Sequence, residues 1–268
     1  MNAYKEAIWN RGDAREIMRE ARRRFRVLMR DSEFEHTPDP HVALASTHYS
    51  LVKRYKKFDP RAIWHAWRAA KHANAAANLD AVSHYKNITP DQADVLSTIL
   101  TKVPKPLGGS LSRARSIARV ALHRAEEMLP HTYAFLILRL AEIDLALGFA
   151  KGVVLDKYIR AKSLKESVLS EEDKVMAKRQ WCRIASAIGL FYIDILEEDV
   201  GRYADDRITC EGEELLVEAL RLSREVLDGR QLSRDQELKI LIELRNRGIK
   251  ESDLASWTKP DDWEPETE

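Results

Sequence analysis

Glycine, proline and cysteine are all scarce in this chain of 268 residues, and each scarcity excludes something. Ten glycines and nine prolines leave long stretches without a helix breaker, because both residues are unfavourable inside helices. The two cysteines, Cys182 and Cys210, have no metal-ligand neighbour at a usual spacing and provide no disulfide framework. The longest apolar run, residues 133–138, is far too short to cross a membrane.

Other familiar signals are missing as well. The first residues lack the apolar core of a secretory signal. The sequence contains no phosphate-binding glycine loop, nucleophile elbow or Cys-x-x-Cys pair. Hydrophobic residues make up 44% of the chain and charged residues 32%, which is typical of a folded protein. We therefore expect a cytoplasmic, non-enzymatic protein with no cofactor and no metal site.

The apolar residues recur at helical spacing along almost the whole chain, and no segment alternates as a strand would. This pattern predicts an all-α fold of about ten antiparallel helices joined mostly by short loops. Capping patterns mark several starts, among them Asp59-Pro60 and the capping box of Thr89 and Gln92. The expected helices cover residues 13–30, 39–58, 59–77, 89–103, 111–128, 133–147, 154–168, 170–195, 216–227 and 233–247.

Two of these helices carry more specific expectations. Alanines in the helix after Asp59 would let a neighbouring helix approach closely. Its buried face is expected to comprise Ile63, Trp67, Ala70, Ala73 and Ala77. The helix of residues 170–195 has two apolar stripes, so we expect two helical neighbours for it. One stripe holds Ala177, Trp181, Ile184, Ile188, Phe191 and Ile195, and the other holds Cys182, Ala185 and Gly189.

The central helices resemble the tetratricopeptide repeat over about residues 111–227. The first-helix signature of that repeat is matched in spacing by Trp181, Ile184, Ala185 and Ile188. The second-helix signature is matched by Val154, Tyr158 and Ala161. The resemblance implies a right-handed helical array with a concave surface that binds a peptide or another protein. The helix pairs recur at about 40 residues, a spacing that HEAT-like or irregular helical hairpins fit equally.

The clearest break in the helical pattern lies at residues 104–110. Helical spacing resumes at once, so a loop is favoured over a domain boundary, and residues 1–249 are expected to form one array. Residues 250–268 form an acidic tail with two basic and seven acidic residues. Because burying a large aromatic side chain is worth roughly 2–3 kcal/mol, Trp257 and Trp263 are predicted to anchor this tail on its own helices or on a partner.

Charge is divided unevenly although the formal net charge is only +1. Residues 1–130 carry 23 basic and 14 acidic residues, whereas residues 131–268 carry 21 and 29. Residues 11–30 alone hold eight arginines against three acids. Such a helix is either a solvated outer face or a binding surface for an anionic partner. The predicted binding surface comprises Arg15, Arg19, Arg22, Arg23, Arg26, Arg30, Lys53, Arg54, Arg115 and Arg119.

Two patterns suggest metal chemistry and are discounted. Residues 33–36 contain Glu-x-x-His once, in an expected loop, whereas di-iron bundles need two copies on helices. Residues 205–213 resemble the second magnesium motif of class I terpene synthases, an isoprenoid enzyme family, but the first aspartate-rich motif is missing. We expect instead an acidic loop before a helix whose first turn holds Glu213 and Glu214. His48 and His65 are expected to pack within or between helices.

These features favour a helical scaffold or adaptor that mediates protein–protein interaction or self-assembly through a charge-split surface. Its partner would be a protein or peptide, acidic where it meets the basic half, or a second copy of the chain. Nucleic-acid binding through the basic N-terminal half is the alternative. The arginine-rich helix contains no interleaved Tyr, Trp or Gly, and this absence argues against stacking on the bases of a single strand.

Overall fold

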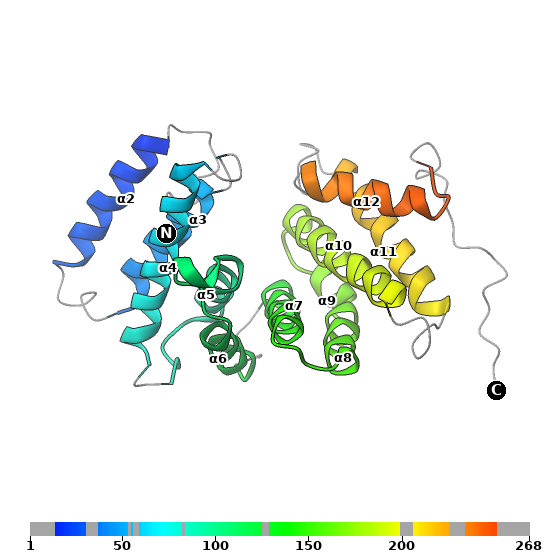
Figure 1. Ribbon diagram of the computed structural model, residues 1–268, viewed down its shortest axis with the longest axis horizontal. Helices are drawn as coiled ribbons and strands as arrows, with labels where there is room; N and C mark the ends of the chain where they lie inside the picture. The colour runs from blue at the N-terminus through cyan, green and yellow to red at the C-terminus, as the bar shows by residue number, and fades with distance from the viewer. Residues whose placement is uncertain are drawn as a thin grey trace. The chain divides into compact units, whose positions relative to one another are not determined.

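The computed structural model describes residues 14–30, 37–52, 55, 59–81, 84–124, 129–198, 206–225 and 234–250 (Figure 1). Within these ranges, the side chains of residues 14, 15, 17, 194–198, 206–209, 225 and 234–236 are not described. All secondary structure in the described ranges is helical, which confirms the all-α prediction. Over the same ranges, every helix is too short or too polar to traverse a lipid bilayer.

The chain groups into two compact units. Unit 1 comprises Met1–Met128 and Arg139–Ala150, and unit 2 comprises Leu129–Leu138 and Lys151–Glu268. Helix α7 (Pro130–Ala146) therefore contributes residues to both. The break at residues 104–110 lies inside unit 1. The predicted acidic tail lies outside the described residues from residue 251 on.

Unit 1 is built from successive helices that pack as neighbours. They are α2 (Ala14–Leu28), α3 (Asp39–Val52), α4 (Pro60–Leu79), α5 (Pro90–Lys102), η1 (Lys105–Leu107) and α6 (Leu111–Leu122). Helix α3 packs against α2, α4 and α5, and α5 also packs against α4 and α6. Both expected caps are present: the Asp59 carboxylate accepts from the Arg61 N–H at 2.8 Å, and Thr89 and Gln92 make both bonds of a capping box.

Helix α4 is turned differently about its axis from the sequence-based expectation. Ala70, Ala73 and Ala77 are buried as expected, but Ile63 and Trp67 are 45% and 41% exposed. The inward face is formed by small residues, Ala62, Ala66, Ala69, Ala73 and Ala76. Helix α4 has helical neighbours on two sides, α3 and α5, and its contacts with them are lined mostly by alanines, together with His65 and His72. Ile63, Trp64 and Trp67 lie outside these contacts.

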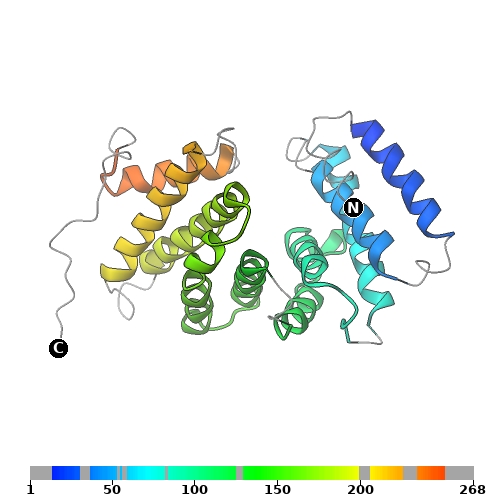
Figure 2. The ribbon, with the colours of Figure 1, turned by 180° about the vertical axis from the view of Figure 1, so that it is seen from behind.

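Unit 2 is organised around its longest helix. It comprises α8 (Lys151–Lys162), α9 (Lys165–Leu169), α10 (Lys174–Glu198), α11 (Asp206–Glu225) and α12 (Arg234–Asn246) (Figures 1 and 2). One side of α10 packs on α8, where the Phe191 and Tyr158 rings stack with centroids 3.6 Å apart. The small-residue side packs on α11, where the Cys182 thiol donates to the Ala219 carbonyl at 3.1 Å. Helix α9 packs on α10 as well, so α10 has a third neighbour that its two stripes did not predict.

Several expected boundaries are wrong. The second helix ends at Val52 rather than residue 58, and the expected helix of residues 154–168 is two helices separated at Ser163 and Leu164. Helix α11 begins at Asp206, so Glu213 and Glu214 lie beyond its first turn and most of the expected acidic loop is helical. Close packing on α10 extends this helix toward its N-terminus, because Gly212 lies against Tyr192 and Gly189.

Candidate binding face of unit 1

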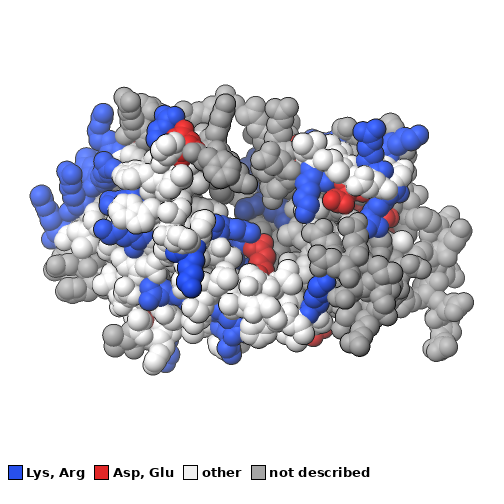
Figure 3. Space-filling view, viewed as in Figure 1, with Lys and Arg blue, Asp and Glu red and all other residues white. Residues whose placement is uncertain are grey.

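Helix α2 presents a stripe of arginines on its exposed side. Arg19, Arg22 and Arg26 lie on the helix and Arg30 in the turn that follows it, at intervals of three, four and four residues, and all four are exposed. None of the four forms an ion pair with a described carboxylate. The opposite side of α2 buries Met18 and Ala21. Figure 3 shows Lys and Arg side chains gathered over this helix.

Two other arginines of α2 share one carboxylate of the same helix. Arg23 and Arg24 share the carboxylate of Glu20, with nitrogen–oxygen distances of 2.8 and 2.6 Å. Their hydrogen bonds lower the pKa of Glu20 to about 2. Arg23 is therefore a poorer candidate for contacting an anionic partner than Arg19, Arg22 or Arg26.

A second stripe runs along the exposed side of α4 and meets the first. Arg61, Trp64, Arg68 and Lys71 succeed one another at intervals of three, four and three residues. The Arg22 guanidinium carbon lies 6.0 Å from the centre of the Trp64 ring, which joins α2 to α4. The two stripes and Trp67 are called the basic face from here on. Its residues are Arg19, Arg22, Arg26, Arg30, Arg61, Trp64, Trp67, Arg68 and Lys71.

The cations of α4 surround the two tryptophans. The Arg68 guanidinium carbon lies 5.8 Å from both the Trp64 and the Trp67 ring centre, and Lys71 Nζ lies 5.5 Å from the Trp67 ring centre. Each tryptophan is 41% exposed. Arg61 differs from the other cations, because Asp59 pairs with it at 2.9 Å.

Four histidines lie in two pairs between α3 and α4, and Trp64 packs against one pair. His41 Nδ1 lies 3.0 Å from His72 Nδ1, and His48 Nδ1 lies 2.9 Å from His65 Nδ1. The rings of His48 and His72 are stacked with centroids 5.9 Å apart, which joins the pairs into what we call the histidine ladder. Trp64 makes edge contacts with His48 and His65, at 5.4 and 4.8 Å between centroids.

The histidine ladder is held in its neutral form. Burial lowers the pKa of His48 to about 3, assisted by the neighbouring His65 and His72 and by two arginines. Burial, with His41 and two cations nearby, lowers the pKa of His72 to about 4. The pKa values of His41 and His65 are lowered by burial as well. Each Nδ1–Nδ1 contact then joins one N–H donor to one unprotonated acceptor.

The ladder confirms that His48 and His65 pack between helices, but its pairing was not predicted. The signal was present, because both helices carry histidines seven residues apart and a hairpin reverses their order. No group of three or more His, Cys, Asp or Glu among the described residues is arranged to hold a metal ion. The ladder is therefore a packing element under the basic face rather than a metal centre.

Two further predicted surface residues, Arg115 and Arg119, do not join this face. Arg115 on α6 donates to the buried carboxylate of Asp144 at 2.5 Å, and its guanidinium carbon lies 4.5 Å from the Phe149 ring centre. Arg119 is exposed on the same helix, which Figures 1 and 2 show apart from α2 within unit 1. Outside the described residues or side chains lie Arg15, Lys53, Arg54, Trp257 and Trp263.

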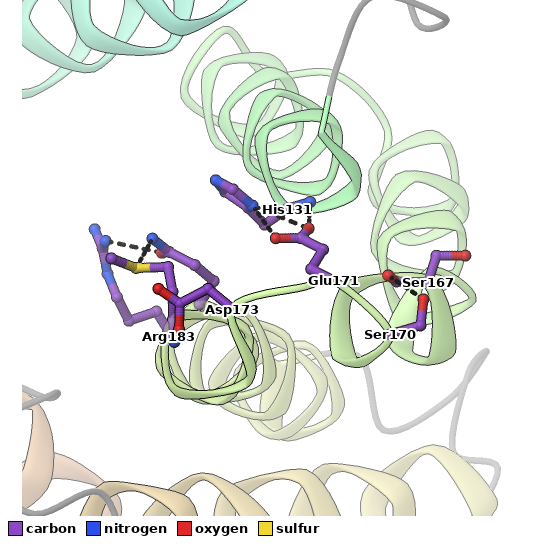
Figure 4. A network of polar contacts seen from close by, with 8 residues as sticks. His131, Ser167, Ser170, Glu171, Asp173 and Arg183 are labelled. Carbon is purple, nitrogen blue, oxygen red and sulfur yellow. Dashed lines mark hydrogen bonds and ion pairs between the residues drawn. The ribbon is translucent and has the colours of Figure 1, made fainter.

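Unit 2 contains a polar network that superficially resembles a catalytic arrangement (Figure 4). The Glu171 carboxylate lies 2.7 Å from His131 Nδ1 and also accepts from the His131 backbone N–H at 3.0 Å. The nearby serine hydroxyl, that of Ser170, donates instead to the Ser167 carbonyl at 2.9 Å, and both serines lie on the far side of Glu171. Glu171 therefore holds the first turn of α7 in place through its contacts with His131. Among the residues drawn in Figure 4, it activates no nucleophile.

The acidic segment that begins α11 has basic partners within unit 2. Glu211 forms an ion pair with Lys162, and Glu213 lies 3.5 Å from Arg247. Burial raises the pKa of Glu213. Carboxylates engaged in this way connect α11 to α8 and to the turn after α12, rather than converging on a cation.

No protein-family model matches the chain, and neither the curated proteins nor the solved structures contain a significant match to it.

Proposed function

We propose that this protein binds nucleic acid through the basic face of unit 1. The observation that carries the proposal is the meeting of two exposed cationic stripes at Trp64. Six of their cations, Arg19, Arg22, Arg26, Arg30, Arg68 and Lys71, form no ion pair with any described carboxylate. A phosphate backbone supplies regularly spaced negative charges that such stripes can neutralise.

The charge arrangement favours a polyanion over a single small anion. Arg19, Arg22 and Arg26 span about 10 Å along α2, at a rise of about 1.5 Å per residue, and Arg30 follows in the turn after the helix. That length corresponds to successive phosphates of a nucleic-acid strand. The arginine-rich helix α2 has no interleaved Tyr, Trp or Gly, which counts against base stacking on that helix alone. Helix α4 supplies two tryptophans next to the arginines.

Salt dependence and charge removal test this proposal directly. Binding of a fluorescent 20-nucleotide strand should weaken steeply with salt, with a log–log slope of about −4 if six phosphates are neutralised. The double variant Arg22→Gln/Arg26→Gln should make the slope shallower by about 1 to 1.5. The matched control, Arg183→Gln/Arg245→Gln, removes two exposed arginines from unit 2 and should bind as the wild type does. No detectable binding at 20 mM salt would reject the proposal.

A scaffold function remains a second candidate, because unit 2 exposes apolar side chains on its last described helix. Leu238 and Ile242 of α12 are 56% and 48% exposed and lie four residues apart on one side. Such a stripe suits contact with a protein, and a right-handed array of tetratricopeptide-like or HEAT-like helix pairs would present it. Analytical ultracentrifugation at low and high salt tests self-association of the charge-split chain. A monomer at every salt concentration would rule out the hypothesis of self-association.

A further inference from the structure

Trp64 and Trp67 are the feature of the basic face that phosphate binding does not explain. Each leaves 41% of its surface exposed on α4, although a large aromatic side chain gains roughly 2–3 kcal/mol on burial. Phosphates need cations and hydrogen-bond donors, and an indole ring offers no charge to them. Two exposed tryptophans among unpaired cations therefore point to a ligand that has flat π surfaces as well as negative charge.

The structure holds the Trp64 ring in place. Its edge contacts with His48 and His65 fix one side of the ring against the histidine ladder. Those histidines are buried between α3 and α4, so the support does not move independently of the helices. A ring that is already ordered loses little conformational entropy when a ligand stacks on it.

The cations lie where a strand backbone would pass. Arg68 lies equally close to the two tryptophans, Lys71 lies beyond Trp67, and Arg22 lies on the α2 side of Trp64. Each ring thus has a cation on at least one side, within about 6 Å of its centre. Along α4 the two tryptophans are flanked by cations, with Arg61 before them and Arg68 and Lys71 after them. A nucleotide strand likewise carries phosphates on either side of its bases.

We infer that the basic face binds single-stranded nucleic acid, with bases stacked on Trp64 and Trp67 and phosphates paired with Arg22, Arg68 and Lys71. Bases are accessible for stacking in single strands, whereas a duplex hides their flat surfaces between neighbouring pairs. DNA and RNA share this chemistry. The inference rests on the proposed function and names its substrate class.

The test compares ligands and variants of Trp67, which has no contact with the histidine ladder among those described. Fluorescence anisotropy measures binding of labelled single-stranded DNA, single-stranded RNA and duplex DNA of 20 nucleotides or base pairs, with polyglutamate as a competitor. Trp67→Ala should weaken single-strand binding about tenfold, because one stacked base contributes a factor of that order. It should leave duplex binding unchanged within twofold.

Two further variants separate stacking from apolar burial. Trp67→Phe keeps an aromatic ring and should bind single strands within about threefold of the wild type. Ile63→Ala removes an aliphatic side chain of similar exposure from the same helix and should bind within twofold of the wild type. Circular dichroism confirms that each variant is folded as the wild type is.

The outcomes distinguish the two proposals. Equal affinity for single strands and duplex, with no effect of Trp67→Ala, would overturn the stacking inference and leave nucleic-acid binding intact. No binding to any oligonucleotide at 20 mM salt would reject both. Polyglutamate that binds more tightly than either strand would identify an acidic polypeptide as the ligand and overturn the inference. Relative affinity for DNA and RNA identifies the strand type.

Discussion

The α3–α4 pair of unit 1 and the α10–α11 pair of unit 2 both bring two helices close together, but they place their tryptophans differently. In α10, Trp181 is fully buried and small residues line the contact with α11. In α4, alanines fill the inner side, and Trp64 and Trp67 lie on the exposed side. A large apolar residue on an amphipathic helix therefore belongs to the core in one unit and to a candidate binding face in the other.

The two tryptophan sites should differ most in the free energy of unfolding that is lost when the side chain is removed. Trp181→Ala empties a fully buried site, so we expect the free energy of unfolding to fall by about 3–5 kcal/mol. Trp67→Ala removes a side chain that is 41% exposed, and its cost should stay below about 1 kcal/mol. Urea unfolding followed by circular dichroism measures both. Equal losses for the two variants would show that the two environments are not distinct.

Periodicity and caps were enough to predict the helices, but not the rotation of α4. Seven of the eight alanines from Ala62 to Ala77 lie on one side of the helix at about 100° per residue, and this is the side that is buried. The expectation used the largest side chains, Ile63 and Trp67, as markers of the core. The contacts with α3 and α5 are instead lined mostly by alanines, with His65 and His72 as the larger buried residues.

Contacts between helices could not be predicted from the sequence either. The Nδ1–Nδ1 pairs and the approach of Arg22 to Trp64 depend on the register of α2, α3 and α4, which no single helix encodes. Helix α10 was easier, because its two stripes differ in residue size. Glycine, alanine and cysteine on one side and bulky residues on the other indicate two neighbours at different distances.

Acid should destabilise the α3–α4 pair through the histidine ladder. The folded pKa values of His48 and His72, about 3 and about 4, lie below the ordinary value of 6.5. The unfolded chain therefore binds more protons between these limits, so stability is complete above pH 6.5 and declines as pH falls toward the folded pKa values. Between pH 7.5 and 5.5 each of the two histidines should cost about 1 kcal/mol.

Hydrogen-exchange mass spectrometry measures this effect on α3 and α4 peptides, after correction for the intrinsic exchange rate at each pH. Protection should fall between pH 7.5 and 5.5 in the wild type. The variant His48→Gln/His72→Gln should be less stable at pH 7.5 but should show a shallower decline. Acid-independent protection of α3 and α4 in the wild type would contradict the role assigned to the ladder.

The two pairs also differ in how closely their helices approach each other. A Cβ on Gly189 would lie 2.8 Å from the Leu216 side chain and 2.9 Å from the Gly212 carbonyl oxygen, which is backbone and cannot turn aside. Gly189→Ala should therefore destabilise unit 2 by about 1–3 kcal/mol, although alanine is the better helix former.

Gly212 provides the matched comparison on the facing helix. A Cβ there would lie 3.1 Å from Tyr192 Cβ and 3.3 Å from the Gly189 carbonyl oxygen, so the surroundings need to give by only a few tenths of an ångström. The gain in helix propensity, up to about 1 kcal/mol, offsets that strain, and Gly212→Ala should be nearly neutral. Urea midpoints measure both variants. Equal, small losses for Gly189→Ala and Gly212→Ala would contradict this prediction. They would show that alanine fits between α10 and α11 as it does between α3 and α4, so that glycine does not distinguish the two pairs.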